Sequence, residues 1–190
     1  MSKLEIIVAS TRPGRVGLPV GRWLESEAKQ HNGFTDVELV DLAEWNLPFM
    51  DEPNHPRLGN YVHQHTRDWS SKIAEADAFV FVMPEYNYGF NAPLKNAIDY
   101  LYAEWLYKPV GFASYGGVSA GTRAAQMIKQ VVSALKMVPV VEAVSIPFVQ
   151  QFLTEDGTIT PTDVMTSAAK DMLDELHRMS DTLRPIRLQR

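Results

Sequence analysis

The sequence contains no cysteine. This absence excludes disulfide bonds, thiolate metal sites and a cysteine nucleophile. The chain also lacks any apolar run close to the roughly 20 residues of a membrane-spanning helix, so we expect no membrane association. No charged and then apolar leader precedes the first apolar run at Lys3. Together with the missing cysteines, this predicts a cytoplasmic location.

Basic residues are scarce, with 18 lysines and arginines against 23 acidic residues and a net charge of -5. No basic residues are concentrated in a run of the kind that neutralises nucleic-acid phosphates, so we expect no nucleic-acid partner. The composition, 45% hydrophobic and 22% charged, is that of a globular protein. The length predicts that residues 1–190 form a single domain.

Five short apolar runs alternate with segments of helical spacing. The runs read LEIIVA, VELVDL, AFVFVM, VGFASY and VPVVEAVSI. The central runs are apolar on successive residues, which is typical of strands buried on both faces of a parallel sheet. The first intervening segment repeats apolar residues at Leu18, Trp23 and Ala28, the spacing of a helix. The last helix is predicted to begin after Thr162 or Asp163, since either residue can cap it.

Five βα units with right-handed crossovers predict an α/β fold. For this length we expect a flavodoxin-like three-layer sandwich, in which a five-stranded parallel sheet has the strand order 2-1-3-4-5. Ligands of such sheets bind outside the carboxyl ends of the strands. The proline-punctuated stretch 42–60 follows the second strand, and we expect it to be an irregular covering loop.

The loop after the first apolar run reads ASTRPGRVG, residues 9–17. It is not a Walker A loop, because no lysine follows Gly17. It matches half of the dinucleotide fingerprint, with Gly14, Gly17 and an acid at Asp41. Hydroxyls, guanidinium groups and helix amides fit one terminal phosphate better. The residues concerned are Ser10, Thr11, Arg12, Arg15, Val16 and Gly17. The alternative is that the hydroxyls only cap the helix and the arginines are solvated.

Two further loops follow the third and fourth apolar runs and fall at the same edge of the predicted sheet. They read MPEYNYGFNAPLKNAIDYL and SYGGVSAGTRAAQ. Tyr86 and Tyr88 offer flat rings to a planar heterocycle, and the glycine pair Gly116-Gly117 lets backbone amides approach it closely. The alternative is ordinary half-buried packing of the tyrosines and an ordinary glycine turn. Three such loops at one edge favour a single binding crevice.

The motifs STRPGRVG, PEYNYGFNAPLKNAIDYL and SYGG with AGTRA together resemble the NADPH-dependent FMN reductase family, which includes quinone, azo-dye and chromate reductases. The resemblance covers residues 3–146 and implies bound FMN, with NADPH or NADH as co-substrate. It implies that the first loop holds the FMN phosphate. It implies that the ribityl chain and ring are lined by Pro84, Glu85, Tyr86, Asn87 and Tyr88, and that the pyrimidine side of the ring meets Ser114, Tyr115, Gly116 and Gly117. Many members carry serine where this chain has Gly17, so one phosphate hydroxyl is missing and Arg15 is expected to compensate.

The resemblance implies an enzyme that passes hydride from a nicotinamide through FMN to a small-molecule acceptor. One crevice and no second nucleotide fingerprint predict that the nicotinamide leaves before the acceptor binds, which is a ping-pong cycle. Quinones, azo compounds, flavins and metal oxyanions are the acceptor classes it suggests. The amides of Gly116 and Gly117 are expected to favour negative charge at the ring edge, and no side chain is expected to be an essential acid or base. The alternative function is a flavodoxin-type electron carrier or a flavin-bound interaction protein without reductase activity.

The aromatic segment YAEWLY and the proline-rich stretch after Asp41, which can cover a neighbour's flavin edge, predict a homodimer or homotetramer. Trp105 and Tyr107 are either core residues or part of that contact. The resemblance implies a flavin near a subunit interface, which favours the contact.

Two other groups of polar residues are not expected to be functional. His63 and His65 are predicted to point to different faces of a helix, and no third ligand has metal spacing, so we expect no metal site. Asn96 and Asp99 are expected to anchor their helix and the loop before it, with Lys95 in solvent.

Overall fold

The structure is a computed structural model that describes residues 2–189. Its five strands form one parallel sheet of order β2-β1-β3-β4-β5. The strands are β1 (Lys3–Val8), β2 (Asp36–Asp41), β3 (Ala78–Pro84), β4 (Pro109–Tyr115) and β5 (Val138–Ile146). The predicted fold class and strand order are therefore confirmed.

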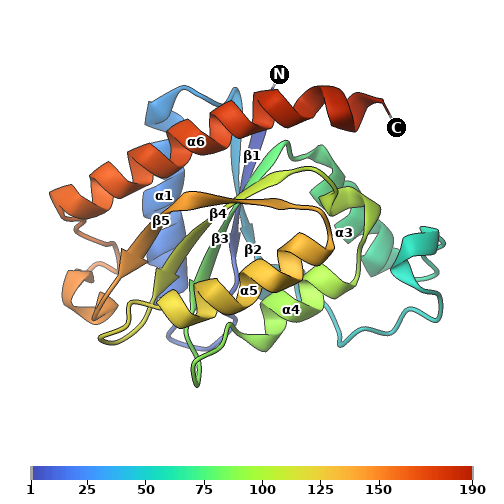
Figure 1. The fold of residues 1–190 in the computed structure, drawn as a ribbon. Helices are drawn as coiled ribbons and strands as arrows, with labels where there is room; N and C mark the ends of the chain where they lie inside the picture. Colours follow the sequence, from blue (N-terminus) through green and yellow to red (C-terminus); the bar gives the residue numbers. More distant parts are fainter. Residues whose placement is uncertain (1, 190) are drawn as a thin grey trace.

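Helices cover both faces of the sheet, which gives the three layers visible in Figure 1. Helices α1 and α6 pack on one face, and α3, α4 and α5 pack on the other. The helices are α1 (Gly17–His31), α2 (Leu42–Trp45), α3 (Gln64–Glu75), α4 (Ala92–Asp99), α5 (Thr122–Ala134) and α6 (Asp163–Leu188). Short 3-10 turns are η1 (Pro56–Leu58), η2 (Ala103–Trp105) and η3 (Val149–Phe152).

The central strand β3 is buried on both faces, as its continuous apolar run predicts. Val80 and Val82 pack into the core under α1 and α6. Phe79 and Phe81 pack into the core under α3, α4 and α5. Because successive side chains of a strand point to opposite faces, a run apolar at every position fills both cores at once.

The long helix α6 begins where the sequence predicts. Thr162 is its N-cap, and the hydroxyl of Thr162 accepts a hydrogen bond of 3.3 Å from the backbone N–H of Met165. In the part of the chain that the structure describes, no helix is both long and apolar enough to cross a membrane.

Trp105 lies inside the protein, which corrects its expected role in a subunit contact. Its side chain is fully buried, and its ring centroid lies 5.0 Å from that of Phe79 and 6.4 Å from that of Trp69. Its indole N–H donates to the carbonyl of Ile98 over 3.1 Å. The turn η2 therefore folds this residue back under the sheet, and Trp105 is a core residue.

The covering stretch after β2 is more regular than the sequence predicts, because it begins with α2 and contains η1. Asn96 joins this stretch to α4 by hydrogen bonds, and its side-chain nitrogen donates to the carbonyl of Pro48 over 2.7 Å. The side-chain oxygen of Asn96 accepts from the N–H of Met50 over 3.0 Å. Asn96 is thus an anchor as expected, but for the covering stretch instead of the preceding loop. Lys95 and Asp99 form an exposed ion pair of 2.6 Å.

His63 and His65 do not point to different faces, so that prediction is wrong. Their rings stack with centroids 5.2 Å apart and planes 8° from parallel. The reason is that His63 is the N-cap of α3, and the helical geometry begins only after it. The Nε2 atom of His63 lies 3.2 Å from the carbonyl oxygen of Asp51, and that of His65 lies 2.9 Å from its carboxylate.

Candidate functional site

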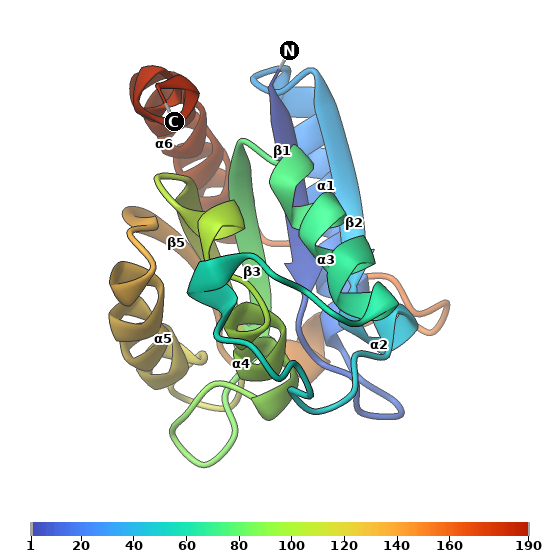
Figure 2. The same ribbon diagram turned by 90° about the vertical axis from the view of Figure 1, so that its right-hand side faces the viewer.

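A cavity of about 410 Å³ opens at the carboxyl edge of the sheet, the edge opposite the N-terminus in Figure 2. This volume lies in the range of small-molecule binding sites. The loops after β1, β3, β4 and β5 all contribute to its wall. The lining residues are Ser10, Arg12, Arg15, Val16, Pro84, Glu85, Tyr86, Tyr115, Gly116, Gly117, Phe148, Val149, Gln150 and Gln151.

The structure thus brings most of the predicted site residues together in one cavity. Thr11, Gly17, Asn87, Tyr88 and Ser114 are not among its lining residues. Thr11 lines a second cavity, of about 470 Å³, between α2, the covering stretch and α4. Ser114 is buried, and its hydroxyl donates to the carbonyl of Ala120 over 2.9 Å. Ser114 therefore holds the loop after β4 in shape instead of facing the cavity.

The first loop does not use its hydroxyls to cap α1. The N-cap of α1 is Val16, which provides no side-chain hydrogen bond, so the alternative reading of Ser10 and Thr11 as mere caps is wrong. Ser10 is buried, and its hydroxyl lies 3.3 Å from that of Tyr86. This contact bridges the loops after β1 and β3 across the cavity.

The two arginines of the first loop differ in their surroundings. Arg15 is mostly buried and forms an ion pair with Asp41 at the end of β2. Its Nε atom is buried and has no hydrogen-bond partner in the structure. Arg12 is exposed, and its guanidinium forms no ion pair or hydrogen bond within residues 2–189. The cavity wall therefore holds one oriented and one unpaired guanidinium, a suitable pair for an anion.

Gly17 makes room for the hydroxyl of Tyr115. A Cβ atom on Gly17 would lie only 2.5 Å from that hydroxyl oxygen. Tyr115 is 4% exposed, and burial raises the pKa of its phenol above the ordinary value. The space beside Gly17 is thus taken by a neutral phenolic hydroxyl from β4.

Tyr86 and Gly89 close a tight hairpin after β3. Their backbone groups exchange hydrogen bonds of 2.8 and 3.0 Å, and the central residues Asn87 and Tyr88 have φ values of 49° and 70°. Two positive φ values are the mark of a type I′ turn. Asn87 and Tyr88 therefore form the hairpin tip, where the ring of Tyr88 lies 3.8 Å from the guanidinium carbon of Arg123.

Glu85 lines the cavity, and its carboxylate bonds to the start of α5 and the loop before it. It accepts hydrogen bonds from the hydroxyl of Ser119 (3.0 Å) and from the backbone N–H (3.1 Å) and Nε (2.6 Å) of Arg123. Burial opposes ionisation, but these bonds hold the pKa of Glu85 below its ordinary value. Glu85 therefore ties the loop after β3 to the loop after β4.

Only one amide of the glycine pair is available to a ligand. The N–H of Gly116 donates to the carbonyl of Ile146 over 3.3 Å. The N–H of Gly117 has no acceptor among the described residues. The expectation that both amides stabilise negative charge is therefore wrong for Gly116, because the sheet neighbour β5 uses it.

The loop after β5 also forms part of the cavity wall, which the sequence motifs did not predict. It contributes Phe148, Val149, Gln150 and Gln151. The N–H of Phe148 donates to the carbonyl of Gly117 over 3.2 Å, which joins this loop to the glycine pair. The signal was present, since this loop also leaves the carboxyl end of a predicted strand.

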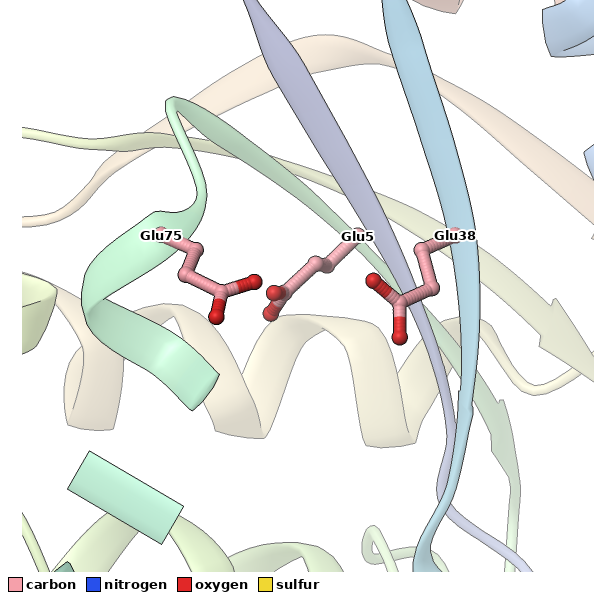
Figure 3. A group of neighbouring side chains, drawn as sticks. All are labelled: Glu5, Glu38 and Glu75. Carbon is pink, nitrogen blue, oxygen red and sulfur yellow. The ribbon is translucent and has the colours of Figure 1, made fainter. Parts of the chain in front are cut away.

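Figure 3 shows one group of acidic residues, Glu5, Glu38 and Glu75, whose carboxylates lie within 4.8 Å of one another. Lys3 lies 2.7 Å from Glu38 and 2.6 Å from Glu75, and Lys72 lies 3.8 Å from Glu5. Lysine ammonium groups are therefore the cations of this cluster. The expectation of no metal site stays a prediction.

The cavity residues fit FMN. The unpaired guanidinium of Arg12, the neighbouring guanidinium of Arg15 and the start of α1 suit a phosphate at one end. Tyr86 and the exposed amide of Gly117 suit a planar ring with acceptor oxygens at the other.

Comparison with known proteins gives the same result. Residues 2–151 match the NADPH-dependent FMN reductase family. An NAD(P)H-dependent FMN reductase of Schizosaccharomyces pombe is 44% identical over 149 residues, which cover 76% of this chain and 74% of the relative. An NAD(P)H:quinone oxidoreductase of Solanum tuberosum is 35% identical over 99 residues, or 50% of this chain and 49% of the relative.

Among solved structures, the NAD(P)H:(acceptor) oxidoreductase FerB of Paracoccus denitrificans superposes with a TM-score of 0.75. It is 20% identical, and the match covers 96% of this chain and 98% of FerB, so it shows a shared fold. The family match and the 44% identity to the Schizosaccharomyces pombe reductase show the family as well as the fold. This chain belongs to the NADPH-dependent FMN reductase family of oxidoreductases, whose cofactors are FMN and NAD(P)H, as the sequence motifs predict.

Proposed function

We propose that this protein binds FMN in the 410 Å³ cavity and transfers electrons from NADPH or NADH to a small planar acceptor such as a quinone. The observation that carries the proposal is the pairing, within one cavity, of the unpaired Arg12 with a glycine loop and a tyrosine. The activities for which the relatives are named, FMN reduction and quinone oxidoreduction, support the same function. A flavodoxin-type electron carrier is not favoured, because the family is one of reductases.

The phosphate of FMN would lie at the first loop. Asp41 is 5% exposed and orients Arg15, which lines the cavity, by its ion pair. Arg12 supplies a charge that no protein carboxylate cancels. Charge-assisted hydrogen bonds of this kind contribute about 1.5–3 kcal/mol each.

When bound, FMN supplies the hydride chemistry, and the protein orients it and tunes its charge. Gly117 presents a free amide to the ring edge, and the loop after β5 holds Gly117 through the bond from Phe148. Glu85 fixes the two neighbouring loops by its bonds to Ser119 and Arg123. No side chain of the cavity needs to act as an acid or base.

Arg12→Ala tests the phosphate loop. Loss of one charged hydrogen bond lowers FMN affinity about ten- to a hundredfold, measured by fluorescence titration. Riboflavin, which lacks the phosphate, binds the wild type far more weakly than FMN. The matched control is Arg22→Ala, an exposed arginine of α1 outside the cavity lining, which leaves FMN affinity unchanged. Equal effects of both substitutions on FMN affinity contradict the proposal. So does a wild-type protein whose flavin absorbance does not fall when NADPH is added without oxygen.

The nicotinamide and the acceptor are proposed to bind in turn at the same face of the cavity. The grouping of the aromatic and glycine residues in a single cavity supports this order. A steady-state matrix of NADPH against a soluble quinone is then expected to give parallel double-reciprocal lines, with competitive inhibition by the quinone. Intersecting lines would reveal two separate sites.

A homodimer or homotetramer is also proposed, through the covering stretch alone, because Trp105 is buried in the core. Phe49 is 85% exposed, Leu58 63% and Val62 50%, and exposed apolar side chains grouped on one segment favour a protein contact. Light scattering at micromolar concentration tests this, and an active monomer contradicts it. The cytoplasmic location stays a prediction.

A further inference from the structure

Phe148 has a backbone conformation that aromatic residues seldom adopt. Its φ and ψ are both 46°, in the left-handed region. Among the residues that line the cavity, it is the one with a positive φ. Glycine and asparagine adopt this conformation with less strain than a bulky residue. Strained residues of this kind gather at binding sites, where the surrounding structure holds them.

Two hydrogen bonds hold Phe148 in this conformation. Its N–H donates to the carbonyl of Gly117 over 3.2 Å, and its carbonyl accepts from the N–H of Gln151 over 2.9 Å. The next residue, Val149, is buried and anchors the turn in the core under α6. The backbone path is thus set by its neighbours, and a smaller residue would follow it equally well. What phenylalanine adds is the ring.

Phe148 lines the cavity and is 49% exposed. Tyr86, from the loop after β3, lines the same cavity and is 42% exposed. Two half-exposed aromatic rings on different walls of one cavity leave apolar surface in water, which a flat ligand would cover.

The charges of the cavity are unevenly distributed. Arg12 and Arg15 are on the loop after β1, whereas the loop after β5 contributes only neutral side chains, those of Phe148, Val149, Gln150 and Gln151. The wall beside Phe148 therefore suits an uncharged planar ring with carbonyl oxygens, to which the glutamine amides can donate. An anion would be drawn to the opposite wall instead.

We propose that Phe148 stacks on the planar electron acceptor and thereby selects flat aromatic acceptors such as quinones. This inference rests on the proposed function. It assigns acceptor recognition to the loop after β5, and FMN binding to the other three loops.

Phe148→Asn is the main test, because asparagine tolerates the left-handed conformation but has no ring. The loss of one aromatic stacking contact raises the KM for a soluble naphthoquinone about two- to tenfold at saturating NADPH. The KM for ferricyanide, which accepts electrons without stacking, changes less than the KM for the quinone. FMN affinity is retained, because asparagine keeps the backbone N–H that donates to Gly117. The Tm stays level or rises by up to about 4 °C, because backbone strain is relieved.

Two variants control for strain and for the ring. Lys136 is also in the left-handed region, with a φ of 55°, but lies outside the cavity lining. Lys136→Asn therefore relieves backbone strain there and leaves the KM for the quinone unchanged. Phe148→Tyr keeps the ring and retains the wild-type KM. A protein that folds better but recognises quinones worse is a result that a purely structural role of Phe148 does not produce.

The inference is overturned if Phe148→Asn leaves the KM for the quinone unchanged while the wild type reduces quinones normally. It is also overturned if FMN affinity falls together with quinone affinity, since Phe148 would then hold the cofactor. A wild type that neither binds FMN nor oxidises NADPH would instead contradict the proposed function itself, so the two failures are distinguishable.

Discussion

Gly17→Ala tests whether the glycine at the start of α1 exists to accommodate Tyr115. The new methyl group would lie 2.5 Å from the hydroxyl oxygen of Tyr115 and 3.4 Å from Cγ1 of Val8. Tyr115 is 4% exposed and packed in the core, so its ring has no free space to move into. Overpacking of this kind costs about 1–3 kcal/mol.

The helix propensity of alanine offsets part of this cost, by up to about 1 kcal/mol relative to glycine. With the full offset, the net loss of stability is therefore about 0–2 kcal/mol. For a chain of this length, each kcal/mol lowers the Tm by about 2–4 °C. We expect the Tm of Gly17→Ala to lie up to about 8 °C below that of the wild type.

Tyr115→Phe supplies the second arm of a double-mutant cycle. Without the hydroxyl, the nearest ring atom to the new methyl group is Cζ at 3.4 Å, an ordinary van der Waals contact. In that background Gly17→Ala is neutral or slightly stabilising. Urea unfolding of the four proteins should then give a coupling energy of about 1–3 kcal/mol. Equal costs of Gly17→Ala in both backgrounds would refute the reasoning, since the hydroxyl would not be what the glycine accommodates.

Two further predictions concern stability. Burial raises the pKa of Glu5 to about 7, against the opposing charges of Lys72, Lys108 and Lys3. Ionisation between the ordinary pKa of 4.5 and pH 7 therefore costs the folded state up to about 3 kcal/mol. The Tm of Glu5→Gln relative to wild type should rise from about pH 5 to about pH 8, and a constant difference would contradict this. Tyr100→Phe removes a hydroxyl 3.0 Å from the carbonyl of Pro48. It should cost about 1 kcal/mol and speed proteolysis of the covering stretch, whereas equal cleavage rates would show that the hydroxyl does not hold it.

The sequence by itself determined the layers and the edge at which the site lies. Runs such as AFVFVM are apolar at every position, so they fit only strands covered on both faces. Parallel strands bring their carboxyl ends to one edge, so Arg12, Tyr86 and Gly117 were expected near one another although they are far apart in the chain. These are local signals, and each depends on residues within a few positions of one another.

The tertiary structure decided which partner each side chain meets. Asp41 pairs with Arg15, β5 takes the amide of Gly116, and the hydroxyl of Tyr115 occupies the space beside Gly17. Trp105 was expected at the surface, but its burial depends on how η2 packs under the sheet. Such contacts join residues tens of positions apart, and composition and spacing carry no record of them. Phe148 entered the site for the same reason, because the packing of β5 beside β4 carries its loop to Gly117.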